Sequence, residues 1–534
     1  MPIISVIIYG ISGDLSFFDQ KLIDRVIKLL GNSLFVSSVV TAISVFFGII
    51  ITFCLRRMQF KGIGILRVLM LLPLVNPAFV GAIAFIMLFG SRGLITYKIL
   101  HLSVSPYGWQ GIVILQVLSL VTYAYILISS SIKNVDTTIE QAARNLGASE
   151  STILFKITLP MMIPEITSAA LLVFLSSMAD FTTPLMIGGK FSTLASDLYV
   201  QITGVYNMKS AAVSGIILLI PCAAAFFAQR HFSTRKSYFS DASNERDIVY
   251  ENVSKPIKMA LIFCTLCFVS FFIIKFGFIV IGALTKNWGY DYTLTLDHVR
   301  EALSMNLRPF VNSVKLSFVT ALTASFMGVV LSYIINRKKI IVPVFVDFIG
   351  VFPAAVPGIL FGIGYLVTFK YPIFGIGKYI LPNLSPWIIL GTSVIIYLIC
   401  IARSLNVAMK SGYALLEHID PDLEDASYNL GAGKIKTFRL VLMPLLTEAV
   451  AASYLKIFSS TMTTLGAIIF LILPKNKVAV QVIFQSITHS AIGVPATLAL
   501  LLSFVTLALM GVFYVILNRK SITDKFKGVI QHEN

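Results

Sequence analysis

Long apolar runs dominate this chain, and each is about as long as a lipid bilayer is thick. A transmembrane helix needs roughly 20 consecutive apolar residues, and residues 111–132, 258–284 and 491–517 are clear examples. Because 57% of the residues are hydrophobic and only 13% are charged, a single soluble core cannot account for all the runs. We therefore expect an all-α polytopic membrane protein with about 11–12 spans.

The expected spans are spread along the whole chain. They cover residues 31–55, 68–90, 111–132, 161–188, 209–229, 258–284, 309–335, 344–369, 387–409, 445–473 and 491–517. Residues 3–11 are apolar as well, but as a helix they would cross only about half of the membrane. The first helix is therefore either short, or the chain begins inside it.

The two halves of the chain repeat each other. Asn-Ser at residues 32–33 opens one long apolar run, and Asn-Ser opens another 280 residues later, at 312–313. Pro73 and Pro77 in the next run match Pro353 and Pro357 at the same offset, and kinks at such prolines either serve a transport site or are only structural bends. We read residues 1–229 as a first repeat and 258–534 as a second. The polar residues 230–257 form a solvated cytoplasmic linker.

A net charge of +17 suggests orientation in a membrane rather than nucleic-acid binding. With the polar repeated loops in the cytoplasm, the cytoplasmic side holds more Lys and Arg than the outer side, as the positive-inside rule requires. Arg403 is counted here with the loop at the end of its span. The five cysteines lie in or at the ends of spans, and the six histidines have no ligand spacing. The sequence therefore assigns no disulfide framework and no metal ligands.

A short polar segment occurs once in each half. The first copy runs from Gln141 to Gly147 and is followed, after nine residues, by residues 157–160, which end in Pro160. The second copy runs from Asp425 to Gly431, and nine residues later comes a segment that ends in Pro444. The spacing from glycine to proline is the same in both. A polar loop repeated at a matched place in two halves predicts a paired docking site for a partner.

The local chemistry of both segments predicts a helix, a turn and a second helix. Thr137 and Glu140 have the spacing of a capping box, and Asp420 can cap the second copy with Pro421 at its first position. The glycines suit a turn because they lack a Cβ atom. The prolines mark where a new helix enters the membrane.

These segments resemble the EAA loop of ABC importer permeases, and the whole chain resembles a fused double permease of the ferric-iron type. The resemblance implies two tandem MetI-like permease repeats, with EAA loops at about 133–160 and 411–444. It also implies that the loops dock on ATPase subunits. The expected coupling residues are Glu140, Gln141, Ala142, Ala143, Gly147, Glu424, Asp425, Ala426, Ser427 and Gly431.

The chain departs from the family's motif in ways that differ between the copies. Gln141 and Asp425 stand where the family has Glu, so Glu140 and Glu424, one residue earlier, are alternative charged contacts. Ser427 replaces the second alanine. These differences imply that the two ATPase contacts are not equivalent.

The chain contains no phosphate-binding loop of the form G-x-x-x-x-G-K-[ST], so we expect no enzyme activity and no cofactor here. ATP and magnesium are expected on two copies of a separate ATPase subunit. An extracytoplasmic binding protein would deliver the solute, and one chain would supply both membrane halves. The resemblance implies a bacterial inner membrane, with the loops and the C-terminus in the cytoplasm.

The expected function is import of a small solute by alternating access, and ferric iron is the leading candidate for that solute. A phosphorylated solute, a phosphonate, thiamine or a polyamine is the alternative within the same class. A secondary transporter driven by an ion gradient is the alternative from another class, but it does not account for the paired loops.

Ionisable groups within spans are costly and suggest a transport path. Asp180 lies in residues 179–184, which resemble the family's Ala-Asp-Phe-x-x-Pro segment. Thr464 stands 284 residues later, at the matching position of the second half. Lys456 either pairs with an acid such as Glu448, contacts an anionic solute, or reaches toward the membrane surface. The candidate path residues are Asp180, Thr182, Thr183, Lys456, Thr461, Thr463 and Thr464. The alternative is that Asp180 caps or breaks its helix and the hydroxyls bond to their own helices.

Overall fold

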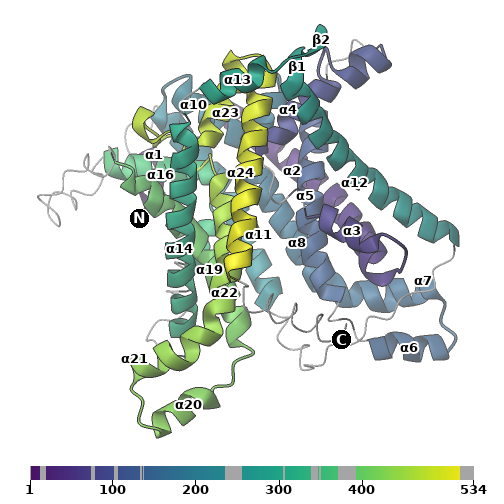
Figure 1. Ribbon diagram of the computed structural model, residues 1–534, viewed down its shortest axis with the longest axis vertical. Helices are drawn as coiled ribbons and strands as arrows, with labels where there is room; N and C mark the ends of the chain where they lie inside the picture. The colour runs from purple at the N-terminus through teal and green to yellow at the C-terminus, as the bar shows by residue number, and fades with distance from the viewer. Residues whose placement is uncertain are drawn as a thin grey trace, which may run out of the picture. The chain divides into compact units, whose positions relative to one another are not determined.

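The structure is a computed structural model that describes residues 2–11, 20–71, 73, 78–101, 106–132, 135, 137–234, 255–304, 307–337, 347, 350–370 and 392–517. Within these ranges, ten helices are long and apolar enough to cross a membrane. Their cores are α2 (Gln20–Arg57), α4 (Ala78–Phe89), α5 (Trp109–Ser131), α8 (Leu159–Ala179), α11 (Met208–Thr234), α12 (Lys255–Leu284), α14 (Arg308–Arg337), α19 (Val394–Leu416), α22 (Met443–Met462) and α24 (Gly493–Leu517). The predicted all-α membrane fold is confirmed (Figure 1).

Shorter elements connect these helices. They are α1 (Pro2–Ile11), α3 (Ile63–Leu69), α6 (Thr137–Asn145), α7 (Glu150–Ile153), α9 (Thr182–Ile187), α10 (Leu194–Thr203), α13 (Asp297–Ser304), α16 (Gly358–Lys370), α20 (Asp422–Asn429), α21 (Lys434–Thr437) and α23 (Ala479–His489). The π-helical segments are η3 (Leu94–Ile99), η5 (Leu154–Thr158) and η8 (Phe438–Leu442), and η7 (Phe352–Ala354) and η9 (Pro474–Asn476) are 3₁₀ turns. One small antiparallel hairpin pairs β1 (Thr285–Asn287) with β2 (Asp291–Leu294).

Several span ends differ from the sequence prediction. The helices expected over 161–188 and 445–473 end earlier, at Ala179 and Met462. The span expected over 344–369 appears as α16, which begins only at Gly358. Hydropathy does not mark these ends, because the residues that follow are also largely apolar. Pro77, residues 338–346 and most of the predicted linker lie outside the described part of the chain.

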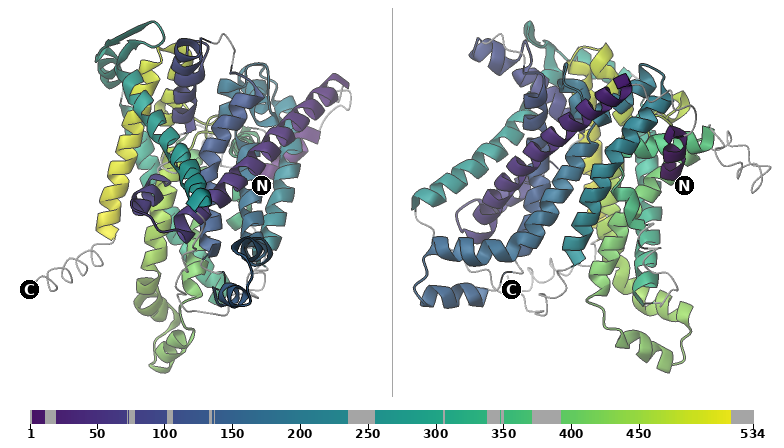
Figure 2. Two further views of the ribbon diagram at one scale, coloured as in Figure 1. Left: turned by 90° about the vertical axis from the view of Figure 1, so that its right-hand side faces the viewer. Right: turned by 180° about the vertical axis from the view of Figure 1, so that it is seen from behind.

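The chain divides into two compact units. The first unit consists of Val6–Arg300 with His489–Thr497, and the second consists of Met1–Ser5, Glu301–Thr488 and Leu498–Asn534. Helix α12 belongs to the first unit, where it packs on α2 and α4 (Figure 2). The compact units therefore differ from the sequence repeats, and the repeat boundaries at 229 and 258 stay a prediction.

Each unit is a bundle of long helices held by apolar side chains. In the first unit, α2, α5 and α8 pack on one another, and α11 packs on α8. In the second unit, α14, α19 and α22 pack together, and Phe513 of α24 contacts Phe318, Tyr454 and Phe458. These bundles hold the loops that follow α5 and α19.

The repeated Asn-Ser pairs play the same structural part in both units. The Ser33 hydroxyl accepts a hydrogen bond of 2.9 Å from the Leu194 amide at the start of α10. Ser313 accepts one of 2.9 Å from the Ala479 amide at the start of α23. The first amides of a helix have no partner within it, so each serine satisfies one of them.

Candidate functional site

The first repeated loop is a helical hairpin with a glycine at its turn. Helix α6 ends before Gly147, whose φ of 81° lies in the left-handed region that a glycine adopts without a Cβ clash. The Gly147 amide donates to the Arg144 carbonyl, and the Ala148 amide donates to the Ala143 carbonyl, both at 3.0 Å. This pair of bonds is the Schellman motif that ends many helices.

The second loop ends its short helix in the same way. Gly431 has a φ of 80°. Its amide donates to Tyr428 at 2.9 Å, and the Ala432 amide donates to Ser427 at 3.1 Å. The Asp420 carboxylate accepts a bond of 3.0 Å from the amide of Asp422, the first residue of α20, whereas Pro421 takes the N-cap position and not the first helical one. Both sequence-predicted turns are therefore present.

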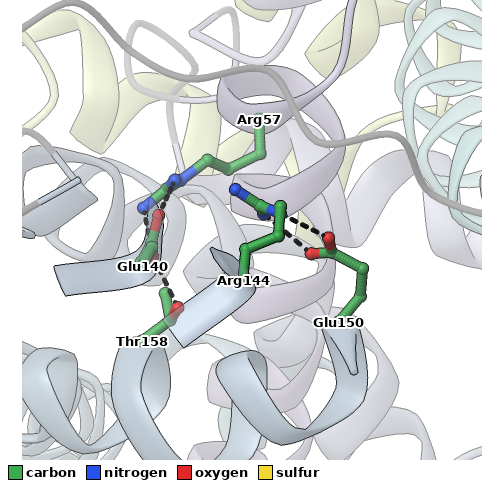
Figure 3. A network of polar contacts seen from close by, with 5 residues as sticks. All are labelled: Arg57, Glu140, Arg144, Glu150 and Thr158. Atoms are coloured by element: carbon green, nitrogen blue, oxygen red, sulfur yellow. Dashed lines mark hydrogen bonds and ion pairs between the residues drawn. The ribbon is translucent and has the colours of Figure 1, made fainter. Parts of the chain in front are cut away.

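Glu140 anchors the first loop from inside. Its side chain and that of Arg57 are 2% and 1% exposed, and the guanidinium holds the carboxylate through two bonds of 2.7 and 3.0 Å (Figure 3). The Thr158 hydroxyl donates to the same carboxylate at 2.6 Å. These contacts join α6 to the end of α2 and the start of α8. Among the described contacts, Glu140 forms no capping box with Thr137, so that prediction is wrong.

Glu424 anchors the second loop at the matching position, with different partners. The Tyr333 hydroxyl donates to its carboxylate at 3.0 Å, and Arg337 forms an ion pair with it at 3.6 Å. Arg337 also donates to the carbonyl groups of Leu416 and Ile419. Each loop is therefore tied by an Arg–Glu pair to the last turn of a long helix, α2 in the first unit and α14 in the second.

The chain after each glycine is one continuous helix with a π-helical segment. In the first unit α7, η5 and α8 join from Glu150 to Ala179, and in the second α21, η8 and α22 join from Lys434 to Met462. Pro160 and Pro444 follow the π-helical segments closely. A proline ring collides with the carbonyl four residues earlier, and a π turn relieves that collision. The prolines therefore lie inside helices rather than at the start of new ones.

The outer face of each loop is apolar and exposed. Leu146 and Leu430 are both 88% exposed, while Ile139 and Leu423 are 46% and 45% exposed. The two pairs stand at matching positions of the repeats. Of the predicted coupling residues, Gln141, Ala142, Gly147, Asp425, Ala426 and Gly431 are exposed, Ala143 and Ser427 are half-buried, and Glu140 and Glu424 are buried. Burial leaves Gln141 and Asp425, not the two glutamates, on the accessible surface.

Asp180 ends α8 and caps α9. Its Oδ1 accepts bonds from the Thr182 amide at 2.9 Å, the Thr182 hydroxyl at 2.7 Å and the Thr183 amide at 3.2 Å. Its Oδ2 accepts a bond of 3.0 Å from Gln116, whose own carbonyl accepts one of 2.6 Å from Ser177. The geometry is that of the capping alternative. A role of Asp180, Thr182 and Thr183 in a path stays a prediction.

The matching region of the second unit contains a cavity of about 180 Å³. Thr461 and Thr464 line it, whereas Thr463 does not. The Thr464 hydroxyl donates to the Ser460 carbonyl at 2.8 Å, and Thr463 donates to Ser459 and Ser460, so both satisfy the end of their own helix. Lys456 is exposed, and in the described part of the chain it forms no ion pair with Glu448.

Arg403 lies in this cavity, and the sequence prediction missed it. It is near the middle of α19 rather than at a span end. The polar residues near it, such as Ser404 and Asn406, made hydropathy place the end of the span too early. The rule that an arginine inside a span suggests function would have selected it had the helix bounds been known.

The comparisons with known proteins agree with this architecture. A family described as "Binding-protein-dependent transport system inner membrane component" matches residues 44–238. The chain is 28% identical over 496 residues to the ferric transport system permease protein FbpB of Actinobacillus pleuropneumoniae, covering 91% of this chain and 70% of the relative. It is 24% identical over 451 residues to the Fe(3+)-transport system permease protein FbpB 2 of Haemophilus influenzae, covering 84% and 81%.

A shorter relative matches one part of the chain more closely. The molybdenum transport system permease protein ModB of Escherichia coli is 31% identical over 176 residues, which are 32% of this chain and 77% of the relative. The chain belongs to the family of binding-protein-dependent transport system inner membrane components. It is thus a multi-pass inner-membrane permease rather than an enzyme.

Proposed function

We propose that this chain supplies both membrane halves of an ATP-driven importer, with two ATPase subunits docked on its two loops. The observation that carries the proposal is the matched construction of the loops. Each has a short helix, a left-handed glycine, an Arg–Glu anchor and an exposed leucine. The loops and the C-terminus would then lie in the cytoplasm, and ATP with magnesium would bind to the partner.

The anchors supply the mechanical link that such coupling needs. Buried polar networks are rigid when their members are satisfied, and Arg57, Glu140 and Thr158 form one between α6, α2 and η5. A displacement of α6 is therefore transmitted to the two long helices beside it. ATP-driven approach of the two ATPase subunits would in this way reorient the spans, which is alternating access.

The exposed apolar faces supply the docking surface. Burying one leucine side chain contributes about 1.5–3 kcal/mol, and Leu146 with Ile139, or Leu430 with Leu423, presents two such side chains per loop. Gln141 is neutral and Asp425 is charged at the matching exposed position. We therefore propose that the two ATPase contacts share the exposed leucine and differ in the polar side chain, which is Gln141 in one loop and Asp425 in the other.

Ferric iron is the proposed solute, delivered by an extracytoplasmic binding protein. The support is the similarity to the relatives named ferric transport permeases, which spans both halves of the chain. The molybdenum relative covers only part of the chain, so it carries less weight. A phosphorylated solute, a phosphonate, thiamine or a polyamine remains the alternative within the class.

The proposal is tested by uptake into proteoliposomes that contain the chain with its ATPase subunits. The binding protein is added outside with radiolabelled iron, and ATP is enclosed on the ATPase side. We expect uptake only when ATP, ATPase and binding protein are all present. Uptake without ATP would replace the importer with a secondary transporter, and ATP-dependent uptake of labelled thiamine in place of iron would change only the solute.

A further inference from the structure

The cavity of the second unit is built from the middle of α19, the last turns of α22 and the chain that follows α22. Its lining residues belong to α19, α22 and the segment just after α22. The helices α19 and α22 lie side by side in the second unit (Figure 1). The lining residues include Arg403, Ser404, Ser460, Thr461 and Thr464. At about 180 Å³ the cavity has room for several water molecules, each with a share of about 30 Å³ in the liquid.

Arg403 is the cationic side chain of this cavity, and no acidic residue lines it. Its guanidinium has no hydrogen bond or ion pair with the described residues, and its Nε is buried without a partner. A guanidinium remains charged in proteins, and an unpaired charge within a membrane bundle is costly. Among the residues that the structure describes, no side chain supplies a compensating negative charge.

A second positive feature lies beside Arg403. A Cβ atom on Gly358, the first residue of α16, would be 2.7 Å from the Arg403 Nη1, so the guanidinium reaches the N-terminus of that helix. The first amides of a helix point outward without intrahelical partners and carry a partial positive charge. A helix N-terminus and a guanidinium at one place both favour an anion.

Hydroxyl groups complete the polar wall. Ser404, Ser460 and Thr461 line the cavity and bring three hydroxyl groups to it. Each can donate to an oxygen of a bound group. A guanidinium with several hydroxyl donors suits an oxygen-rich anion, because its planar fork binds two oxygens at once.

At the corresponding position of the first unit, side chains of the protein already bond to one another. Gln116, Ser177 and Asp180 stand 284 residues before Cys400, Thr461 and Thr464. In the first unit these three side chains bond to one another, and the Asp180 carboxylate supplies the negative charge. In the second unit the carboxylate is absent, and a cation faces the cavity. The corresponding positions therefore form a hydrogen-bonded group in the first unit and line a cavity in the second.

We infer that this cavity binds a small oxyanion, with Arg403 holding two of its oxygens and Ser404, Ser460 and Thr461 donating to the rest. The positive charge of Arg403 repels a bare metal cation. Under the proposed function, the bound oxyanion is therefore either the solute or an anion that enters together with the solute. The inference rests on the proposed function only for the route by which the anion arrives.

The test measures binding without transport, on the full chain purified with its ATPase subunits. Inorganic phosphate is titrated at constant ionic strength, and binding is followed with labelled phosphate and by the rise in Tm. We expect saturable binding to the unaltered chain and at least a tenfold loss of affinity in Arg403→Gln. Arg403→Lys should lose part of the affinity, because it keeps the charge without the fork.

Two controls separate an anion site from a structural role. Lys315→Gln removes an exposed positive charge from α14 of the same unit and should leave phosphate binding unchanged. Without phosphate, Arg403→Gln should keep or raise Tm, because it removes a charge that has no partner among the described residues. Equal phosphate binding by the unaltered chain and Arg403→Gln, or no binding to either, would overturn the inference. Iron uptake is a separate measurement, so a failure here does not decide the proposed function.

Discussion

The first loop has two arginine–glutamate contacts that differ sharply in burial. This difference decides how much each contact contributes to the stability of the protein. The pair Arg57–Glu140 is almost fully buried, whereas Arg144–Glu150 has side chains that are 34% and 45% exposed. Both contacts are 2.7 Å long (Figure 3). An exposed pair contributes little because water screens it, while loss of one member of a buried pair leaves a charge without compensation.

The substitution Glu140→Gln should therefore destabilise the first unit. We expect the free energy of unfolding to fall by about 3–5 kcal/mol, because Arg57 keeps its charge in a buried site. Denaturant unfolding of the purified protein measures this. The matched control Glu150→Gln should change stability by less than about 1 kcal/mol. Equal effects of the two substitutions would contradict the anchoring role.

Asp180 allows its two interpretations to be separated. Asparagine caps helices about as well as aspartate, so Asp180→Asn should leave Tm nearly unchanged. The path interpretation requires iron uptake to fall in this variant while the ATPase subunits stay bound. Unchanged uptake would leave Asp180 as a cap alone, and a large fall in Tm would show that the charge itself holds Gln116.

Burial and pairing of single side chains were the least predictable features. The sequence shows Glu140 beside Gln141 but not that one points inward to Arg57 and the other outward. It shows Arg403 in an apolar run but not the cavity around it. Both depend on contacts between residues far apart in the chain, which spacing within one segment does not encode.

At the scale of elements, features written into the local backbone were predicted well. The turns at Gly147 and Gly431 follow from short-range chemistry, and the structure contains both. Asp420 bonds to the first amide of α20, one residue off the predicted cap register. The ends of α8 and α22 were not predicted, because Asp180 and Thr463 stop helices inside stretches that stay apolar. The π-helical segments were missed as well, although Pro160 and Pro444 are the signal that reveals them.

The backbone conformation of Gly147 predicts how its substitution by alanine changes stability. Gly147→Ala meets no atom within 4 Å, but alanine at a φ of +81° should cost roughly 1–2 kcal/mol. We expect a lower Tm and weaker stimulation of ATPase activity by the binding protein. Gly31→Ala on α2 also meets nothing within 4 Å but is helical, so it should be neutral or stabilising. Equal shifts in Tm would refute the conformational explanation.

At the scale of the whole molecule, one chain carries two loops of the same construction with different details. The first anchor uses Thr158 and a two-bond ion pair, while the second uses Tyr333 and a longer ion pair. Their exposed leucines are equivalent. A single chain of this kind should therefore bind two ATPase subunits, at sites that share an apolar contact.

The number of bound ATPase subunits tests this central claim most directly. Leu146→Asp and Leu430→Asp each place a charge in one exposed apolar face, and native mass spectrometry counts the ATPase copies that copurify with the chain. We predict two copies with the unaltered chain, one with either variant and none with both. Leu294→Asp, at an 80% exposed leucine of β2, is the control and should retain two. Two copies retained by the double variant would contradict the account.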